Sequence, residues 1–416
     1  MKDSAIQVDG ARLANELEEL AAISDAEPPA VTRVLYTDAD LRARAFLKKR
    51  CAAAGLAVRE DALGNLFARW MGSTPQAPAI GTGSHTDAIP HSGRYDGTVG
   101  VLGGLEALRA LRASGFQPRR SLELLMFTSE EPTRFGLGCV GSRALSGATD
   151  AKSLAELRDP EGQRLDDVRK AAGFGGDLAQ VRLAPDYYAA FVELHIEQGP
   201  LLERESVPIG VVTAIAAPAA LRVELEGAGG HAGGVLMPDR KDALCAAAEV
   251  VLAVEAAARA THGPDTVATT GVCKVHPGAI NSIPNKVVLE IDIRDVALAP
   301  RDIALKAVKE AVAAVAAKRG IQARVTELNA DPPATMAPAV VSAALKACKK
   351  RGYEARQMPS RAYHDSLYMA RLFPTGMIFI PCRGGVSHRP DEFSSTDAIR
   401  MGVEVLAETL AELANT

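Results

Sequence analysis

Apolar residues recur at intervals of three and four positions along several stretches of the chain, which is the spacing of one face of an α-helix. The pattern predicts a helix over 98–114, TVGVLGGLEALRALRAS, that ends at Gly115. The same spacing predicts helices over residues 10–24, 38–55, 241–260, 302–318 and 338–350. The first two of these lead into the polar motifs and are interpreted as scaffold.

Short apolar runs bounded by small or polar residues lie between these helices and predict strands. They are AIGTGSH (79–85), SLELLMFTSEE (121–131), LRVELEGAGG (221–230), VATTGVCKV (267–275), KVVLEIDIRDV (286–296) and TGMIFIPC (375–382). Alternating strands and helices are typical of a largely parallel sheet with helices on both faces. We therefore predict an α/β fold with a mixed, mostly parallel sheet.

The chain of 416 residues is longer than one hydrophobic core usually serves, so we expect more than one domain. Residues 213–328 have their own sequence of strands and helices and resemble a small α+β unit inserted into a larger domain. The larger, catalytic domain is then discontinuous, formed by residues 1–212 and 329–416.

The net charge of −4 gives no basic surface of the kind that holds nucleic acid or an anionic membrane. We therefore expect a small-molecule substrate and neither of those partners. The six cysteines lie far apart with no CxxC pair, which favours reduced thiols. The first twenty residues lack the pattern of a secretory signal, so a cytoplasmic protein is expected.

Residue types that bind metal gather where the predicted strands end. GSHTDAIPHSGRYDG contains His85, Asp87 and Asp96, where Asp87 is placed to orient the imidazole of His85 and Asp96 could bridge two cations. A polar loop with acids and histidines by chance is the alternative for this segment alone.

Two adjacent carboxylates follow the strand that ends near 127. Glu130 and Glu131 repel each other unless a cation or a shared proton relieves them. One can bind metal, while the other can take a proton from water and pass it to a leaving nitrogen. A solvated edge is the usual explanation of paired glutamates, but the apolar strand before them and Pro132 after them disfavour it here.

Two further histidines follow strands, His195 in VELHIEQGP and His388 in CRGGVSHRPDE. They complete a candidate ligand set of mixed imidazole and carboxylate groups: His85, Asp96, Glu131, His195 and His388. Such a set suits zinc, manganese, cobalt or nickel, and the ligand types do not choose among them.

The inserted segment offers polar groups for a substrate. His231 in GAGGHAGG could donate to an oxyanion, Asn281 could hold an amide or hydroxyl, and the planar fork of Arg294 could grip a carboxylate. The glycines of GAGGHAGG are not followed by the lysine and serine or threonine of a phosphate-binding loop, so a nucleotide site is not expected here. The alternative for Arg294 is a structural bridge to Asp292 or Asp295.

Taken together, SEEPTRFG, ELHIEQGP, GGHAGG, NSIPNK, DIRD and SHRPDE resemble the dinuclear amidases of the aminoacylase and carboxypeptidase metallohydrolase clan. The nearest group holds N-carbamoyl-L-amino-acid hydrolases, allantoate amidohydrolases and ureidoglycolate amidohydrolases. The motifs IPHSGRYDG, RAYHDSLYMAR and MIFIPCRGGVSH look most like the last of these. The resemblance covers nearly the whole chain and implies hydrolysis of the carbamoyl C–N bond of a small ureido acid, (S)-ureidoglycolate first.

The resemblance also implies roles for individual residues. His85 and His195 would hold separate cations, Asp96 would bridge them, Glu131 and His388 would complete the ligands, and Glu130 would be the catalytic base. Two divalent cations per subunit are implied, manganese first, with zinc, cobalt or nickel as alternatives. A homodimer is implied in which His231 and Asn281 reach the partner's site while Arg294 binds the substrate carboxylate. The remaining pocket positions are Gln198, His364 and Gly385.

One motif departs from much of the group. RAYHDS stands where many carbamoylases and allantoate enzymes have SGAGHD, so Arg361 and Tyr363 would crowd or repolarise the pocket. This favours the ureidoglycolate type. The alternatives are an N-carbamoyl-L-amino-acid or allantoate amidohydrolase, then an aminoacylase or dipeptidase, and finally a non-catalytic metal-binding homologue.

Overall fold

The computed structural model describes residues 6–416, which divide into two compact units. The first unit contains the chain up to Thr213 together with Thr335–Met358 and His364–Thr416. The second contains Ala214–Ala334 and the short segment Pro359–Tyr363. The first unit is therefore built from three separate pieces of sequence, and each unit has its own hydrophobic core.

A nine-stranded sheet runs through the first unit, in the order β15-β8-β17-β7-β4-β6-β3-β2 with β16 paired to β8. Its central ladders, β17 with β7, β7 with β4 and β4 with β6, are parallel, whereas β8, β3 and β2 are antiparallel to their neighbours. The strands are β2 (Ala57–Glu60), β3 (Leu66–Trp70), β4 (Ala79–His85), β6 (Leu122–Phe127), β7 (Tyr188–Ile196), β8 (Ile209–Ile215), β15 (Ala334–Thr335), β16 (Ala355–Ser360) and β17 (Thr375–Ile380). A separate antiparallel pair joins β1 (Val31–Arg33) to β5 (Ala88–Ser92). The expected mixed α/β sheet is confirmed.

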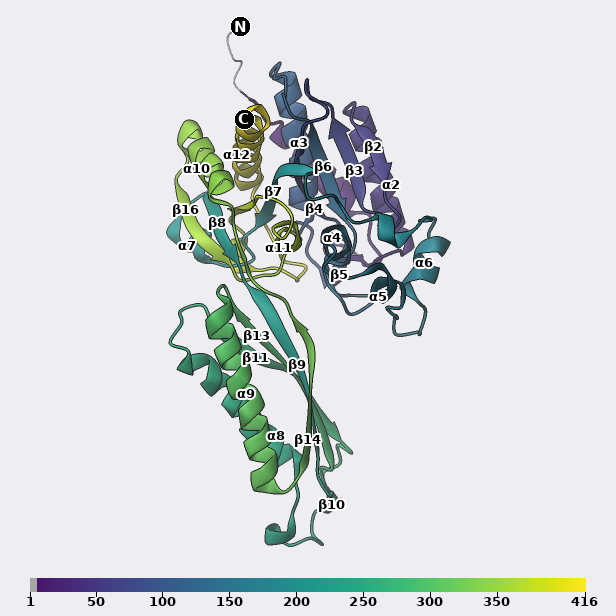
Figure 1. The fold of residues 1–416 in the computed structure, drawn as a ribbon, viewed down its shortest axis with the longest axis vertical. Coiled ribbons are helices and arrows are strands. Elements are labelled where there is room, and N and C mark those ends of the chain that lie inside the picture. Colours follow the sequence, from purple (N-terminus) through teal and green to yellow (C-terminus); the bar gives the residue numbers. More distant parts are fainter. Residues whose placement is uncertain (1–5) are drawn as a thin grey trace. The chain divides into compact units, whose positions relative to one another are not determined.

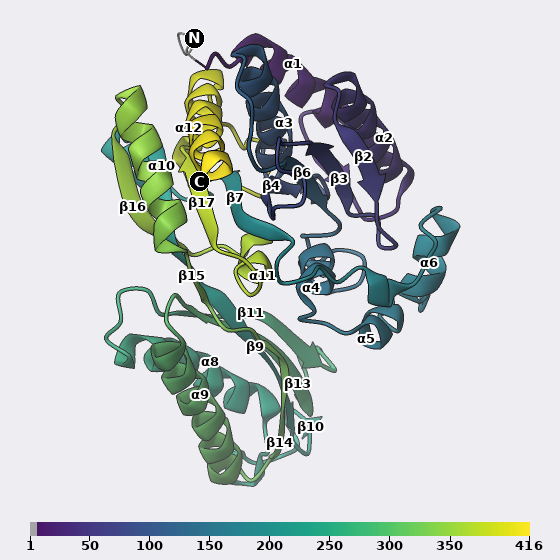
Figure 2. The same cartoon turned by 45° about the horizontal axis from the view of Figure 1, so that its top comes forward.

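Helices cover both faces of this sheet (Figures 1 and 2). One face carries α1 (Gly10–Ala21), α3 (Thr98–Ala113), α10 (Pro338–Arg351) and α12 (Thr396–Asn415). On the other face lie α4 (Val140–Ser146) and α11 (Ser366–Met369). The remaining helices of the unit are α2 (Asp38–Ala53), α5 (Ala151–Ala155), α6 (Leu165–Ala171) and α7 (Leu201–Glu205).

Residue alternation along the central strands separates two buried clusters. In β6, Leu124 and Met126 face the cluster beneath α3 and α12, while Leu125 and Phe127 face the opposite one. This period of two is what a strand buried on both faces requires. In β7 the same alternation places His195 on the face of Phe191, opposite to Leu194 and Ile196.

The parallel strands bring the predicted chemistry to one edge. Because β17, β7, β4 and β6 run in the same direction, their carboxyl ends meet at a single edge of the sheet. His85 is the last residue of β4 and His195 is near the end of β7. Glu130 and Glu131 follow β6, and the segment carrying His388 follows β17.

The second unit is a four-stranded antiparallel sheet of order β11-β13-β9-β14. Two helices, α8 and α9, pack on one face, where Val223, Leu289 and Val308 belong to its core. Its elements are β9 (Ala217–Glu226), β10 (Gly230–His231), α8 (Ala243–Ala260), β11 (Val267–His276), β12 (Ser282–Ile283), β13 (Lys286–Asp295), α9 (Leu298–Arg319) and β14 (Gln322–Ala330).

Most expected elements are found, with shifts of a few residues at their ends. Among the elements that were not anticipated are the strands β8, β14 and β16, the helix α12 and the short helices α4, α5, α6, α7 and α11. The transfer of 359–363 to the second unit was also not anticipated, because it is decided by long-range contacts. No helix within residues 6–416 combines the length and apolar character needed to cross a membrane.

Candidate metal centre

Two imidazoles lie side by side at the edge where the parallel strands end. His85 on β4 and His195 on β7 are both buried, and their ring centroids are 6.1 Å apart. Asp96, in the loop after β5, reaches both of them with one carboxylate oxygen. Its Oδ1 lies 3.4 Å from His85 Nε2 and 3.2 Å from His195 Nε2.

The other carboxylate oxygen of Asp96 faces a second group of polar atoms. Asp96 Oδ2 lies 3.4 Å from His388 Nε2, which in turn lies 3.1 Å from Glu131 Oε1. Two sets of candidate ligands therefore share Asp96. They are His85, Asp96 and His195, and Asp96, Glu131 and His388, with ligand atoms in each set within 4.8 Å of one another.

Backbone carbonyls fix the tautomer of both buried imidazoles. His85 Nδ1 lies 3.0 Å from the carbonyl oxygen of Asp87, and His195 Nδ1 lies 2.9 Å from that of Ile196. A carbonyl can only accept, so each Nδ1 carries a proton, and each Nε2 faces Asp96, where it can bind a cation once it carries no proton of its own. The N–H of Gly97 donates to His195 Nε2 at 3.1 Å, as this tautomer requires.

This arrangement fits divalent cations. The Nε2 atoms of two imidazoles and the oxygens of Asp96 and Glu131 converge on one region at the strand ends. Glu131 Oε1 is buried, and the polar atom facing it is His388 Nε2 at 3.1 Å. Such acceptors repel one another unless positive charge lies between them, and mixed nitrogen and oxygen donors suit first-row divalent ions.

Asp87 supports the centre from behind. Its carbonyl oxygen holds His85, and its two carboxylate oxygens accept the backbone N–H groups of Glu130 (3.1 Å) and Glu131 (3.0 Å). The imidazole of His85 is therefore oriented by the carbonyl rather than by the carboxylate, whose Oδ1 is 3.6 Å away. One residue thus links the ends of β4 and β6.

Gly97 permits the loop of Asp96 to pass close to His85. It has a φ of +65°, and a Cβ at this position would lie 2.4 Å from His85 Nε2. Both facts exclude a larger residue here without displacement of the ring.

Glu130 lies beside the ligand sets, with Oε2 3.9 Å from His85 Nε2. Burial raises the pKa of its carboxyl well above the usual value, and the neighbouring carboxylates of Glu131 and Asp365 add to this increase. The thiol of Cys139 lies 3.5 Å from Glu130 Oε1. A carboxyl of raised pKa is suited to accepting and returning a proton near neutrality.

Without a cation, protons hold the ligand groups together. Asp96 and Glu131 raise the pKa of His388 to about 11, so its imidazole is positively charged. Burial opposes ionisation of Asp96, but His195, His388 and His85 outweigh it and lower the pKa of Asp96 well below its usual value. Burial and the charge of Asp96 raise the pKa of Glu392 to about 7.

The expected pocket residues of the first unit lie around this centre. Gln198 Nε2 donates to Asp96 Oδ2 at 2.6 Å, and His364 stacks edge-on against His195 with centroids 4.6 Å apart. Burial lowers the pKa of His364 well below its usual value, so this imidazole is neutral. Gly385 packs tightly against the backbone between Gly199 and Pro200.

The other three substrate candidates belong to the second unit. His231 and Asn281 are both exposed and lie near each other, because the N–H of Ala232 donates to the Asn281 carbonyl at 2.9 Å. Arg294 on β13 is paired with Asp292, Nε to Oδ1 at 2.7 Å. The guanidinium of Arg294 thus forms an ion pair within the second unit, which is the structural bridge to Asp292 that the sequence left open as the alternative.

Four polar residues near the centre were missed in the sequence: the buried Glu392, Glu193 and Asp365 and the partly buried Ser387. Glu193 accepts a hydrogen bond from Ser84 Oγ at 2.7 Å. Glu193 lies two residues before His195 on the same strand, so its side chain points to the same face of the sheet, and this spacing was the available signal. Glu392 ends the SHRPDE motif, so its proximity to His388 was the available signal.

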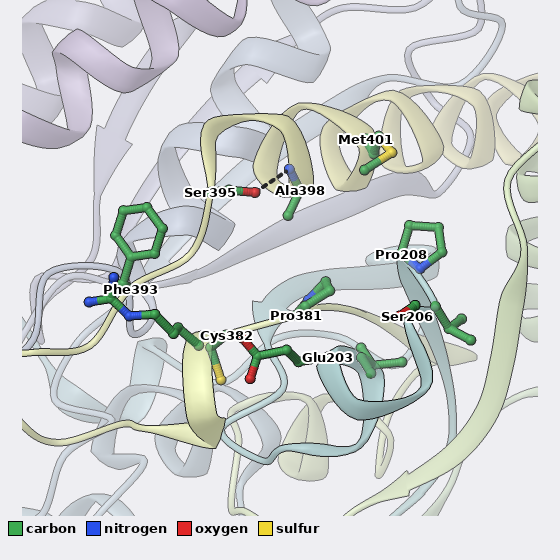
Figure 3. Close-up of a pocket in the computed structure, with 12 residues that line it drawn as sticks. Glu203, Ser206, Pro208, Pro381, Cys382, Phe393, Ser395, Ala398 and Met401 are labelled. Atoms are coloured by element: carbon green, nitrogen blue, oxygen red, sulfur yellow. Dashed lines mark hydrogen bonds between the residues drawn. The ribbon is translucent and has the colours of Figure 1, made fainter.

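A cavity of about 340 Å³ lies elsewhere in the first unit, between α7, α12 and the segment after β17 (Figure 3). Its lining includes Val207, Pro381, Phe393 and Met401 and is mostly apolar. None of the candidate ligands lines it, so this cavity is not the candidate metal centre.

The comparisons with known proteins agree with this geometry. The model of peptidase family M20/M25/M40 matches residues 81–412, a span that includes every candidate ligand. The chain belongs to peptidase family M20/M25/M40. Members of this family are metal-dependent hydrolases, and the chain is an amidohydrolase of this family.

The chain is similar over its whole length to proteins of this family. A ureidoglycolate hydrolase of Arabidopsis thaliana is 51% identical, covering 99% of this chain and 88% of that protein. An N-carbamoyl-L-amino acid amidohydrolase of Geobacillus stearothermophilus is 38% identical, covering 98% and 99%. Solved structures of AtUAH in complex with (S)-hydroxyglycine and with glyoxylate each match with a TM-score of 0.91 at 50% identity, covering 99% of both chains.

Cation uptake by the metal-free protein is expected to release protons. Because the pKa of His388 is raised to about 11, this imidazole is protonated at all lower pH values and must lose its proton to become a ligand. Cation affinity should therefore fall as the pH is lowered. Calorimetric titration with Mn²⁺ near pH 8, in two buffers of different ionisation enthalpy, measures the number of protons.

His388→Ala is the matched variant for this titration. It should release about one proton fewer than the wild-type protein. Identical heats in both buffers for the wild-type protein would contradict the charged state of His388.

Proposed function

We propose that this amidohydrolase cleaves the carbamoyl C–N bond of (S)-ureidoglycolate, yielding glyoxylate, ammonia and carbon dioxide. The observation that carries the reaction type is the buried convergence of His85, Asp96 and His195 beside Glu130. The 51% identity to a ureidoglycolate hydrolase over 99% of the chain supports the substrate. The similarity to AtUAH bound to (S)-hydroxyglycine and glyoxylate supports the products.

The proposed ligands divide between two cation positions that share Asp96. His85 and His195 belong to one ligand set and would hold the same cation, which corrects the expectation of separate cations, and Glu131 and His388 would hold the other. Manganese is the proposed ion, with zinc, cobalt or nickel as alternatives. Divalent cations in such a site polarise a carbonyl oxygen and lower the pKa of water.

Glu130 is proposed as the general base and acid. Its carboxylate accepts a proton from the attacking water as the water oxygen bonds to the ureido carbonyl carbon. The same carboxyl then gives this proton to the departing nitrogen when the C–N bond breaks. The protons therefore balance without another donor. The carbamic acid that remains loses carbon dioxide as its second C–N bond breaks and its acid proton moves to nitrogen, and the (S)-hydroxyglycine so formed decays to glyoxylate and a second ammonia.

The second unit is proposed to hold the rest of the substrate. His231 donates a hydrogen bond to the oxygen that becomes negative, Asn281 binds a polar group, and Arg294 binds the carboxylate. For this last role Arg294 must exchange Asp292 for the substrate. Both partners are only partly buried, so this exchange costs little.

The segment before His364 departs from the carbamoylase pattern, and this difference in sequence favours (S)-ureidoglycolate. Tyr363 donates to Asp331 at 2.8 Å and Arg361 pairs with Asp265, so both side chains are fixed within the second unit. They take the place of the small residues that the carbamoylase pattern has there. N-carbamoyl-L-amino acids are the second candidate substrates, because the Geobacillus relative is 38% identical over nearly the full chain.

A homodimer is proposed in which His231 and Asn281 act in the site of the partner. Large apolar side chains near these residues in the chain are exposed: Ile280 fully, and Leu236 and Met237 by 72% and 73%. Exposed apolar groups of this size are typical of a surface that another protein covers.

Cytoplasmic residence is proposed as well. All six cysteines are free thiols, as is usual for proteins of a reducing compartment.

The substrate is tested by ammonia release from Mn²⁺-loaded protein. (S)-Ureidoglycolate, allantoate, N-carbamoyl-L-alanine and N-acetyl-L-alanine are compared in parallel, with a chelator-treated control. We expect the highest kcat/KM for (S)-ureidoglycolate and loss of all activity on chelation. Preference for another ureido acid would overturn the substrate, and activity that survives chelation would overturn the metal centre.

Glu130→Gln tests the proton transfer. Because the amide cannot accept the proton, kcat should fall by about 10²–10⁴-fold, the range for general acid and base groups. Bound manganese, measured by elemental analysis, should be unchanged. Glu131→Gln is the matched control and should lose cation binding. Wild-type turnover by Glu130→Gln would remove Glu130 from the mechanism.

Shared sites can be tested by co-expressing two inactive variants, Glu130→Gln and His231→Ala. A mixed dimer contains one site with an intact Glu130 from one subunit and an intact His231 from the other. Random pairing should restore about a quarter of wild-type activity. If the tagged and purified mixed dimers stay as inactive as the parents, each site uses its own His231.

A further inference from the structure

A buried carboxylate that has no part in the proposed reaction connects two loops of the metal centre. Glu392 follows η3 (Arg383–Gly385) and is 4% exposed. No ion pair within residues 6–416 joins it to a lysine or arginine. A buried carboxylate without a cationic partner is costly, so its contacts must compensate.

One carboxylate oxygen of Glu392 holds the backbone of the loop that carries Asp96. Glu392 Oε1 accepts the N–H of Tyr95 at 2.8 Å and the N–H of Asp96 itself at 3.1 Å. The loop lies so close that a Cβ on Gly93 would be 2.4 Å from the same oxygen. The position of Asp96 is thus set by two hydrogen bonds to a single atom.

The other oxygen reaches the loop that carries His388. Glu392 Oε2 lies 3.0 Å from Ser387 Oγ, which lies 2.7 Å from Asp96 Oδ2. Ser387 precedes His388, whose φ of +58° lies in the left-handed region that few residues other than glycine adopt. Glu392 therefore accepts the backbone N–H of Asp96 directly and is connected to the Asp96 carboxylate through Ser387.

Glu392 is itself held rigidly. Its N–H donates to the carbonyl of Arg389 at 3.1 Å. The residues after it are attached to the end of β17, since Phe393 accepts from the N–H of Arg383 at 2.8 Å and Ser394 Oγ donates to Pro381 at 2.8 Å. Figure 3 shows Phe393 and Pro381 on this segment. The support for Asp96 is thereby anchored to the central sheet.

We propose that Glu392 is a positioning residue that sets the distance between Asp96 and His388 and so the affinity of the metal centre. The role rests on the proposed cation binding. It depends on the length and hydrogen-bonding shape of the side chain and not on its negative charge. Groups that orient metal ligands in this way typically change affinity by 10- to 100-fold when removed.

Two substitutions separate shape from charge. In Glu392→Gln the amide carbonyl can replace Oε1, and the amide N–H can donate to Ser387 Oγ, which keeps its own proton for Asp96. In Glu392→Asp the charge is retained, but the side chain is shorter by one methylene and cannot hold both amides in the same position. Ser387→Ala removes only the connection to Ser387 and keeps the two backbone contacts.

The experiment measures Mn²⁺ affinity by calorimetry and the cation environment by electron paramagnetic resonance, using the full-length protein. We expect Glu392→Asp to raise the Kd of the more weakly bound Mn²⁺ ion by about 10- to 100-fold. The Kd of Glu392→Gln should remain within about threefold of the wild-type value. Ser387→Ala should lie between them. Excess Mn²⁺ should restore most of the kcat of Glu392→Asp without changing KM.

Asp61→Ala is the control for loss of a carboxylate that holds backbone N–H groups away from the metal centre. Asp61 Oδ1 also accepts two backbone N–H groups, those of Leu63 and Asn65, each at 2.9 Å. This variant should lower the melting temperature and leave Mn²⁺ affinity unchanged. An equal loss of affinity in Asp61→Ala and Glu392→Asp would overturn the positioning role.

Two other results also count against the proposal. Wild-type affinity in Glu392→Asp, or a larger loss in Glu392→Gln than in Glu392→Asp, would show that position is not what Glu392 supplies. Absence of cation binding by the wild-type protein would instead contradict the metal centre itself, so the two failures are distinguishable.

Discussion

The repulsion among buried acceptors at the end of the parallel strands is the constraint on which the rest of the structure depends. The Nε2 atoms of His85 and His195 face the carboxylate of Asp96, and Glu130 and Glu131 lie beside them. In the metal-free protein a proton on His388 partly neutralises this charge. A bound cation neutralises it more completely, because each ligand atom can contact the positive charge directly.

Backbone hydrogen bonds keep these groups in place against their repulsion. Carbonyl groups fix the tautomers of the two imidazoles, while Asp87 and Glu392 each use a carboxylate to hold backbone N–H groups of neighbouring loops. Such contacts are possible only because four parallel strands end at one edge and bring four loops together. The fold thus supplies both the ligands and the groups that orient them.

Sequence motifs were informative about the ligands because metal-binding residue types are rare in buried positions. His85, Asp96, Glu131, His195 and His388 were proposed from their types and their places at strand ends, and the structure brings all five together. Glu392 was missed although it lies in the SHRPDE motif. A glutamate in a polar loop has no local signal that distinguishes a buried carboxylate from a solvated one.

The sequence by itself determined the alternation of helices and strands, the residue types at the strand ends and membership of an amidohydrolase family, because these follow from local periodicity and motifs. Only the tertiary structure decided the order of strands, the placement of His85 and His195 in the same ligand set and the assignment of 359–363 to the second unit. Each of these depends on contacts between residues far apart in the chain. Local patterns carry no information about which distant partner a strand or carboxylate will meet.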